Sequence, residues 1–171
     1  MRKRLGLAIL AATFVACDSP TVPNPDSALA ANVAPGAVVA LATGSDITNR
    51  AQGVRQLTFT AQKHADGTTT GAYNFTTEGN YRQLRGTIVC MRVSGDRVFL
   101  VGDVRHDRLT DFPLPVGGIA IEAVDGGNGP GVDQISFLGL APDTDSLQEW
   151  CESGPPGPVS PLEHGHIRIT G

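Results

Sequence analysis

The sequence predicts an all-β protein with a single antiparallel domain of about eight strands. The 21 glycines and 12 prolines among 171 residues favour many turns between short strands over long helices. Segments rich in β-branched and aromatic residues follow one another at hairpin-like spacing, without an amphipathic helical pattern of useful length. Residues 84–104 give the clearest signal, because two such runs flank a polar turn at residues 94–97, where Gly95 can adopt a positive φ. We expect a barrel-like closure, with a sandwich as the alternative.

The N-terminus predicts an exported lipoprotein. Residues 2–4 are basic and residues 5–16 form an apolar run, which at about 12 residues is too short to span a bilayer. The run ends in Phe-Val-Ala-Cys17, which resembles the lipobox of bacterial lipoproteins, although phenylalanine stands where leucine is usual. This resemblance implies a signal peptide at residues 1–16 and a lipid on Cys17, which would anchor the chain to a membrane of the cell envelope, facing the periplasm or the exterior. The alternative is plain secretion, for which residues 28–30 offer an Ala-x-Ala cleavage pattern.

A flexible tether is expected at residues 17–36, where proline, alanine and serine dominate. The β-domain then occupies residues 37–171. Its first strands are expected at residues 37–43, 54–64 and 69–77. The second of these alternates apolar and polar residues, which predicts one buried and one solvated face. An Asp-Gly pair at residues 66–67 predicts a hairpin turn after it.

The later elements are placed by the same rules. After the two strands of residues 84–93 and 98–104, residues 106–116 are expected to be a loop, because Pro113 and Pro115 exclude a central strand. Further strands are expected over residues 117–124, 134–140 and 163–170, with a glycine-rich loop at residues 125–132 and a Gly/Pro loop at residues 153–161. Residues 147–150 predict a single helical turn, capped by the polar residues before it.

The three cysteines are expected to have two different roles. If Cys17 carries a lipid, Cys90 and Cys151 form an even pair in an oxidising compartment. A disulfide between them would stabilise the domain by about 4 kcal/mol in the chain-entropy model. The alternative is two unpaired thiols, with Cys90 simply buried in its strand.

Candidate metal ligands occur in the glycine-rich loop. Asp125, Asn128 and Asp133 supply the oxygen ligands that calcium prefers, but their spacing does not match an EF-hand. Because these residue types are also ordinary in turns, turn chemistry is the default and the sequence predicts no metal or other cofactor. His164 and His166, two residues apart on a predicted strand, are weaker candidates without an identifiable third ligand.

A catalytic site is not predicted. Asp103, His106 and Asp107 could form an acid–base cluster at a strand end, but a charged surface loop explains them equally well. Neither a nucleophile motif nor a phosphate-binding loop accompanies them, so we expect a protein without enzymatic activity, a hydrolase being the less favoured alternative.

The charge balance argues against nucleic acid as a partner. The chain has a net charge of −4, and removal of residues 2–4 would leave 10 basic against 17 acidic residues, a net charge of −7. Binding to a phosphate backbone needs concentrated positive charge. We therefore expect a binding or structural module whose partner is an envelope protein. A barrel interior that carries a small apolar ligand or lipid is the alternative.

A family resemblance covers about residues 37–171. The segments at residues 56–67, 86–90, 94–96, 124–129 and 133–136, with the late Cys151, resemble an uncharacterised β-rich domain of exported bacterial proteins and lipoproteins. More distantly, the chain is similar to the β-rich domains called post-COAP. The resemblance implies an all-β exported domain and the pairing of Cys90 with Cys151. It implies no activity, substrate or catalytic residue.

Overall fold

A computed structural model of the chain describes residues 34, 36–50, 53–78, 82–109, 116–128, 132–136, 139–141, 143–154 and 158–171. The expected signal peptide, Cys17 and most of the expected tether lie outside these residues. The chain divides into two units, Met1–Asn32 and Val33–Gly171, and the second unit contains all of the described residues.

The described part of the second unit forms one antiparallel sheet of 11 strands, which confirms the predicted fold class. The strands are β1 (Val38–Arg50), β2 (Gly53–His64), β3 (Thr69–Thr77), β4 (Arg82–Ser94), β5 (Arg97–Asp103), β6 (His106–Leu109), β7 (Gly118–Val124), β8 (Gln134–Ser136), β9 (Gly139–Ala141), β10 (Val159–Pro161) and β11 (His164–Thr170). Their order is β10-β8-β7-β5-β4-β3-β2-β1-β11, while β6 pairs with β4 and β9 pairs with β7.

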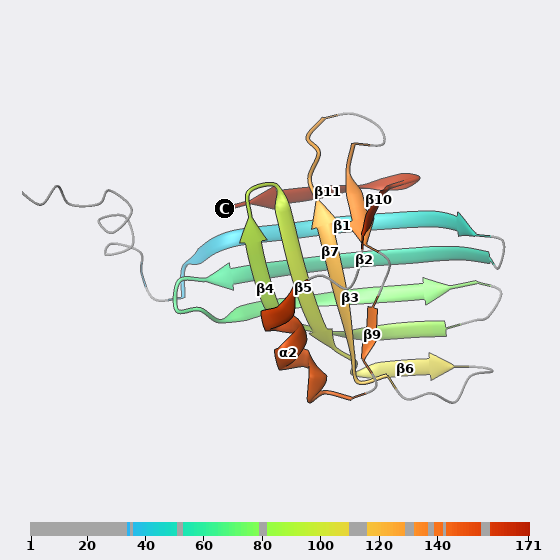
Figure 1. Cartoon of the computed structure of the whole chain (residues 1–171), viewed down its shortest axis with the longest axis horizontal. Helices are drawn as coiled ribbons and strands as arrows, with labels where there is room; N and C mark the ends of the chain where they lie inside the picture. The colour runs from blue at the N-terminus through green and yellow to red at the C-terminus, as the bar shows by residue number, and fades with distance from the viewer. Residues whose placement is uncertain are drawn as a thin grey trace, which may run out of the picture. The chain divides into compact units, whose positions relative to one another are not determined.

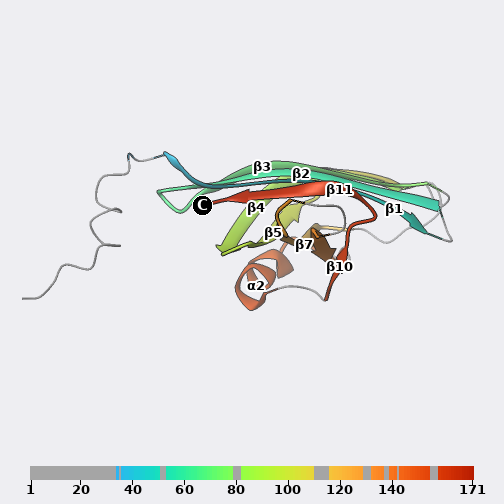
Figure 2. The ribbon, with the colours of Figure 1, turned by 90° about the horizontal axis from the view of Figure 1, so that it is seen from above.

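The sheet curls over on itself at β4. The first part of this strand, residues 82–87, pairs with β3 and β6, whereas the second part, residues 88–94, pairs with β5. We call the first layer sheet A (β11, β1, β2, β3, β6 and the first part of β4) and the second layer sheet B (β5, β7, β8, β9, β10 and the second part of β4). The main strands of sheet B cross those of sheet A steeply, and the two layers lie face to face (Figures 1 and 2). The domain is therefore barrel-like.

Apolar side chains fill the space between the two layers. They come from the inner faces of both sheets, and Leu84, Val98, Leu100 and Ile119 are completely buried. The alternation expected over residues 54–64 is confirmed, because Leu57, Phe59 and Ala61 point into this core while the residues between them are exposed. The sequence also predicts the two hairpin turns correctly: Gly67 and Gly95 both have positive φ, at 87° and 62°.

The corner between the layers depends on a close backbone approach at β4. A Cβ atom on Gly86 would overlap the carbonyl group of Asp103, so only glycine fits there. The Tyr73 hydroxyl donates to that same carbonyl at 2.9 Å. Burial, with a smaller contribution from the charge of Asp103, raises the pKa of this phenol above its ordinary value. The corner is thus fixed by one missing side chain and one buried hydrogen bond.

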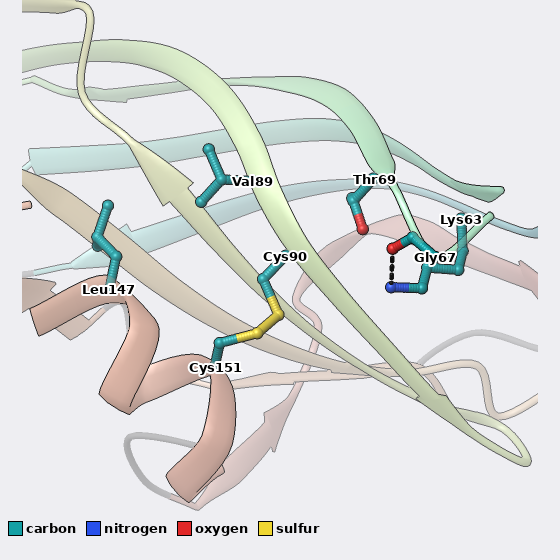
Figure 3. A pocket seen from close by; sticks show the side chains of 7 residues that line it. All are labelled: Lys63, Gly67, Thr69, Val89, Cys90, Leu147 and Cys151. Carbon is teal, nitrogen blue, oxygen red and sulfur yellow. Dashed lines mark hydrogen bonds between the residues drawn. A yellow bond between two sulfur atoms is a disulfide. The ribbon is translucent and has the colours of Figure 1, made fainter.

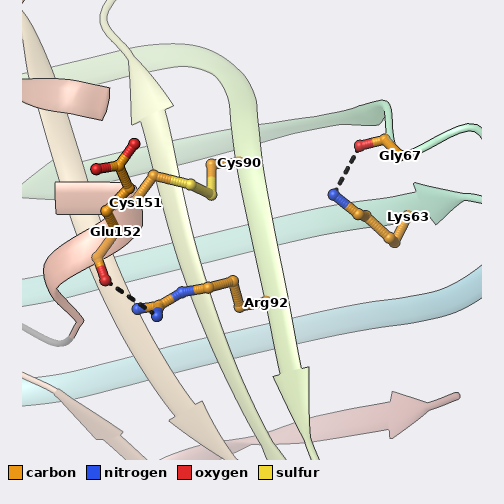
Figure 4. Close-up of a disulfide and its surroundings, with 6 residues drawn as sticks. All are labelled: Lys63, Gly67, Cys90, Arg92, Cys151 and Glu152. Atoms are coloured by element: carbon orange, nitrogen blue, oxygen red, sulfur yellow. Dashed lines mark hydrogen bonds between the residues drawn. A yellow bond between two sulfur atoms is a disulfide. The ribbon is translucent and has the colours of Figure 1, made fainter. Parts of the chain in front are cut away.

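A helix covers the outer face of sheet B (Figure 2). This helix, α2 (Ser146–Ser153), is longer than the single turn expected, and the side chain of Asp145 makes no capping hydrogen bond. Leu147 packs with Phe99 and Val101 of β5 in a second apolar cluster. The disulfide between Cys90 and Cys151 joins β4 to the helix with a Cα–Cα distance of 6.1 Å, as predicted (Figure 4).

Four predicted boundaries were wrong. β1 continues to Arg50, beyond the end expected at residue 43, because the missing side chain of Gly44 leaves room for the ring of Phe59 and Asp46 is buried in an ion pair. The expected loop at residues 106–116 begins with the short edge strand β6, which the prolines do not interrupt because they follow it. The Gly/Pro loop at residues 153–161 ends in β10, which pairs with β8. The strand expected at residues 134–140 is two short strands, β8 and β9.

Candidate functional site

The outward side of sheet A is the candidate site, and we call it the open face. Its members follow from the strand register and from the alternation of side chains along each strand. They are Val38, Leu41, Thr43, Ser45, Ile47, Asn49, Val54, Gln56, Thr58, Thr60, Gln62, His64, Thr70, Ala72, Asn74, Thr76, Gln83, Arg85, Thr87, His106, His164, His166, Arg168 and Thr170. Nothing in the described structure covers this side, whereas α2 lies on the far side of sheet B (Figure 2).

The register arranges these side chains in rows across the strands. One row runs from β11 to β6 through residues that are direct cross-strand partners: His166, Ser45, Thr58, Asn74, Arg85 and His106. Neighbouring strands lie about 4.8 Å apart, so this row spans about 24 Å. The next row contains Arg168, Thr43, Thr60, Ala72 and Thr87. The open face is thus a broad polar surface rather than a cleft.

The ionisable strand residues of the open face are basic. The face carries Arg85, Arg168 and all four histidines of the chain. The strand residues listed above include no aspartate or glutamate, but Glu78 lies beside Val54, to whose carbonyl its N–H donates, and Glu163 accepts from the backbone N–H of Asn49 at 2.8 Å. Arg85 donates from Nε to Oδ1 of Asn74 at 3.0 Å, a neutral partner. The acidic Asp103 borders the face, but Arg105 pairs with its carboxylate at 2.7 Å. In a chain with an excess of acidic residues, this segregation leaves a basic surface.

The structure does not bring Asp103, His106 and Asp107 together as an acid–base cluster. The carboxylate of Asp103 accepts hydrogen bonds from the backbone and the hydroxyl of Thr87, in addition to its ion pair. Asp107 points to the inner side of β6 and pairs with Arg82 at 3.0 Å. His106 is exposed on the open face. These residues lie near one another in the chain but serve separate contacts.

The glycine-rich loop uses its two carboxylates to hold the edge strand β11. Asp133 is buried and accepts from the backbone N–H groups of Ile167 at 2.7 Å and Gly126 at 2.9 Å. Asp125 accepts from the N–H of Ile169 at 2.9 Å and from Gly127 at 3.0 Å. Each carboxylate oxygen thus has a backbone donor, which satisfies N–H groups that an edge strand otherwise leaves unpaired.

Metal ligands do not gather in the part of the chain that the structure describes. No group of three or more His, Cys, Asp or Glu side chains there could hold an ion. Asn128 is exposed in the glycine-rich loop. His164 and His166 lie on the same side of β11, as their spacing predicts, and Nδ1 of His166 lies 3.4 Å from the Ser45 hydroxyl.

Two small clefts lie on the domain, and the second of them includes Asn49 of the open face. The first has a volume of about 270 Å³ between the β2–β3 turn and α2, and the disulfide forms part of its wall (Figure 3). Lys63 at its rim donates to the carbonyl of Gly67 at 2.7 Å. The second, of about 250 Å³, is lined by residues that include Thr48, Arg55 and Glu163. Arg55 there pairs with the buried Asp46 at 2.6 Å, so its charge is compensated within the fold.

Sequence reasoning did not single out Arg85, Arg168 or His64. The signal that existed was the polar side of residues 54–64, which predicts a solvated face. That pattern does not reveal that β11 lies beside β1. Unless this pairing is known, the basic residues of β11, β4 and β6 cannot be assigned to one surface.

In comparisons with protein-family models, with curated proteins and with solved structures, nothing matches this chain. Among the described residues, none of the helical structure is long and apolar enough to cross a membrane.

Proposed function

We propose that the chain is an exported, lipid-anchored binding module that engages its partner through the open face. The observation that carries this proposal is the segregation of charge on an uncovered surface. A chain with 17 acidic and 13 basic residues places two arginines and four histidines among the strand residues of the open face, and these strand residues include no aspartate or glutamate. Surface charges of one sign attract oppositely charged partners and accelerate their association.

Export and anchoring are supported by two independent features. The N-terminal pattern ending at Cys17 resembles a lipoprotein signal, and the Cys90–Cys151 disulfide fits an oxidising compartment outside the cytoplasm. A lipid on Cys17 would hold the domain at the cell envelope through about 20 residues of tether, since β1 begins at Val38.

The two other functions considered receive less support from the described structure. A carrier of apolar ligands needs a hollow interior lined by alternate strand residues, whereas the inner faces here pack against each other through Leu84, Leu100 and Ile119. A hydrolase needs a nucleophile beside a base, and the carboxylate nearest His106 in sequence is already occupied by Arg82.

Intact-mass analysis of the mature protein tests the anchoring. We expect a diacylglyceryl group on Cys17. A free N-terminus at Ala31, which the Ala-x-Ala pattern would produce, would show that the protein is secreted without a lipid.

Differential capture from the native envelope tests the binding surface. Thr58 is exposed at the centre of the open face, so Thr58→Glu introduces a carboxylate there without touching the core. We expect the wild-type protein to enrich an envelope component that Thr58→Glu does not enrich. Asn128→Glu, which adds the same charge at an exposed position in the glycine-rich loop, is the matched control and should behave as wild type. Identical capture by wild type and Thr58→Glu would refute the proposed surface.

A further inference from the structure

We infer that the open face binds an extended acidic polysaccharide, one bearing carboxylate or sulfate groups along a chain of sugars. This inference rests on the proposed function and names the chemistry of the partner. It follows from the positions of the basic residues, from the neutral surface between them and from the side chains that the face lacks.

Five of the six arginines and histidines of the open face lie at two opposite borders, and His64 on β2 is the exception. His164, His166 and Arg168 lie on β11 at one border, and Arg85 and His106 lie on β4 and β6 at the other. Four strand spacings separate His166 from Arg85 in the same row, which corresponds to about 19 Å. A small anion can contact only one border at a time. A polymer with repeated acidic groups can contact both when it crosses the strands.

The surface between the borders is neutral and rich in hydrogen-bonding groups. Thr43, Ser45, Thr58, Thr60 and Asn74 lie there, and their hydroxyl and amide groups both donate and accept. Sugar hydroxyls have the same double capacity, so a polysaccharide chain can replace the water on such a surface group by group.

Arg85 is oriented along the sheet before any ligand binds. Its Nε donates to Asn74 on β3. The amide oxygen of Gln83 on β4, when turned toward Arg85, accepts from Nη2 at 2.6 Å and from Nε at 3.0 Å, and none of the described carboxylates pairs with Arg85. A guanidinium group presents parallel N–H donors that match the two oxygens of a carboxylate or sulfate. The imidazole groups at both borders supply at least one N–H donor in either protonation state.

The composition of the face argues against other polymers and surfaces. None of its members is a phenylalanine, tyrosine or tryptophan, so nucleotide bases find no stacking platform. Its apolar members Val38, Leu41, Ile47, Val54 and Ala72 do not form an apolar centre, because Thr58 and its polar neighbours occupy the middle of the face, whereas protein interfaces have an apolar centre. An acidic glycan needs neither feature.

Binding to defined polysaccharides tests the inference. The purified full-length protein is titrated against immobilised polygalacturonate, a polymer of sugar carboxylates, and against dextran, a neutral glucan. We expect binding to polygalacturonate that weakens as the salt concentration rises, and at least about 10-fold weaker binding to dextran.

The substitutions locate the ligand. Arg85→Gln and Arg168→Gln should each weaken polygalacturonate binding about 3-fold, and the double variant about 10-fold. Arg92→Gln removes the same charge from an exposed position outside the open face, where Arg92 lies over the ring of Phe99, and should bind as wild type does. All variants should retain the thermal stability of the wild-type fold within a few degrees, apart from a small loss for Arg92→Gln.

The outcomes separate the two proposals. Equal binding to dextran and polygalacturonate, or no binding to either, refutes the acidic-glycan inference. The proposed function is then tested separately, by comparing what wild type and Thr58→Glu capture from the envelope. Binding that Arg92→Gln weakens as much as the double variant does places the ligand elsewhere and also refutes the inference. Binding that only the open-face variants weaken supports it.

Discussion

The outer faces of sheet A and sheet B differ in their exposure to solvent. On sheet B, Phe99, Val101 and Ala120 lie under α2 and are at most 6% exposed. On sheet A, the outward residues remain in water, as Thr58 and Thr60 show. Within one continuous sheet, the central strands of sheet B are therefore buried on both faces, whereas the strands of sheet A are buried on one face only. The difference separates the part that stabilises the fold from the part that is available for binding.

The strand compositions account for this difference. β5 and β7 are buried on both faces and contain almost no exposed residue, apart from Arg97 at the start of β5. Strands buried on both faces need apolar residues at nearly every position, whereas half-solvated strands alternate. Glu122 is the acidic exception within β7, and Arg97 neutralises it at 2.6 Å. A helix fixed by a disulfide can cover sheet B because that sheet offers it an apolar surface (Figure 4).

The largest expected effect concerns the covered half. Replacing both Cys90 and Cys151 by serine opens a covalent link between residues 61 positions apart. The free energy of unfolding should fall by about 4 kcal/mol, because the unfolded chain gains conformational freedom. Chemical denaturation of the oxidised wild type and of the double variant measures this loss.

Reduction of the wild type provides the control for that comparison. Under reducing conditions the wild type should lose nearly the same free energy of unfolding, and the double variant should not change. A double variant as stable as the oxidised wild type would mean that α2 is held to sheet B by packing alone.

A pair of apolar truncations compares the two halves directly. Leu147 of α2 is 8% exposed and packs on β5, so Leu147→Ala should cost about 2–3 kcal/mol through lost burial and a residual cavity. Ile47 on the open face is 41% exposed, so Ile47→Ala should cost less than about 1 kcal/mol. Thermal or chemical unfolding measures both variants. Equal losses would show that the open face is packed in solution and would contradict the description of it as uncovered.

The edge strand β11 of sheet A should depend on the carboxylate of Asp133. Asp133→Asn keeps the shape of the side chain but replaces one of its two acceptor oxygens by an NH₂ group, which cannot accept from a backbone N–H. We expect a loss of about 2 kcal/mol, since the buried N–H group of Ile167 and the part-buried N–H group of Gly126 donate to this carboxylate. Asn128→Ala, in the same loop at an exposed position, should change the stability by less than about 0.5 kcal/mol. Calcium should not stabilise the wild type if both carboxylates serve backbone donors, and a large rise in its melting temperature with calcium would contradict this role.

The local elements could be predicted from the sequence because their causes are local. Alternation over residues 54–64 and the glycines at the turns specify strands and hairpins without knowledge of the rest of the chain. The end of β1 expected at residue 43 was too early. A glycine and an acid do not indicate a strand until the ring of Phe59 is known to fill the space at Gly44 and Arg55 is known to pair with Asp46.

The candidate site could be predicted only in part, because it depends on long-range pairing. His164 and His166 were recognised as sharing one side of a strand. Their proximity to β1, and through it to β2 and β3, follows from the pairing of the last strand with the first. Residues more than 100 positions apart meet there, and no periodicity in one segment encodes that contact. The same pairing brings Asp125 and Asp133 to β11 as partners for its backbone.

The smallest expected effect concerns the corner where the two layers meet. Burial raises the pKa of Tyr73 above its ordinary value of 10.0, so the folded protein retains the phenolic proton where the unfolded chain has lost it. The stabilisation is therefore fully present below about pH 10 and decreases as the pH rises above that value. Near-ultraviolet absorbance should show one of the two tyrosines of the chain ionising only when the fold is lost, and Tyr73→Phe should remove this late component. Ionisation of Tyr73 at its ordinary pH in the folded protein would show that solvent reaches the corner. It would contradict the description of β4 as a tightly packed connection between the two layers.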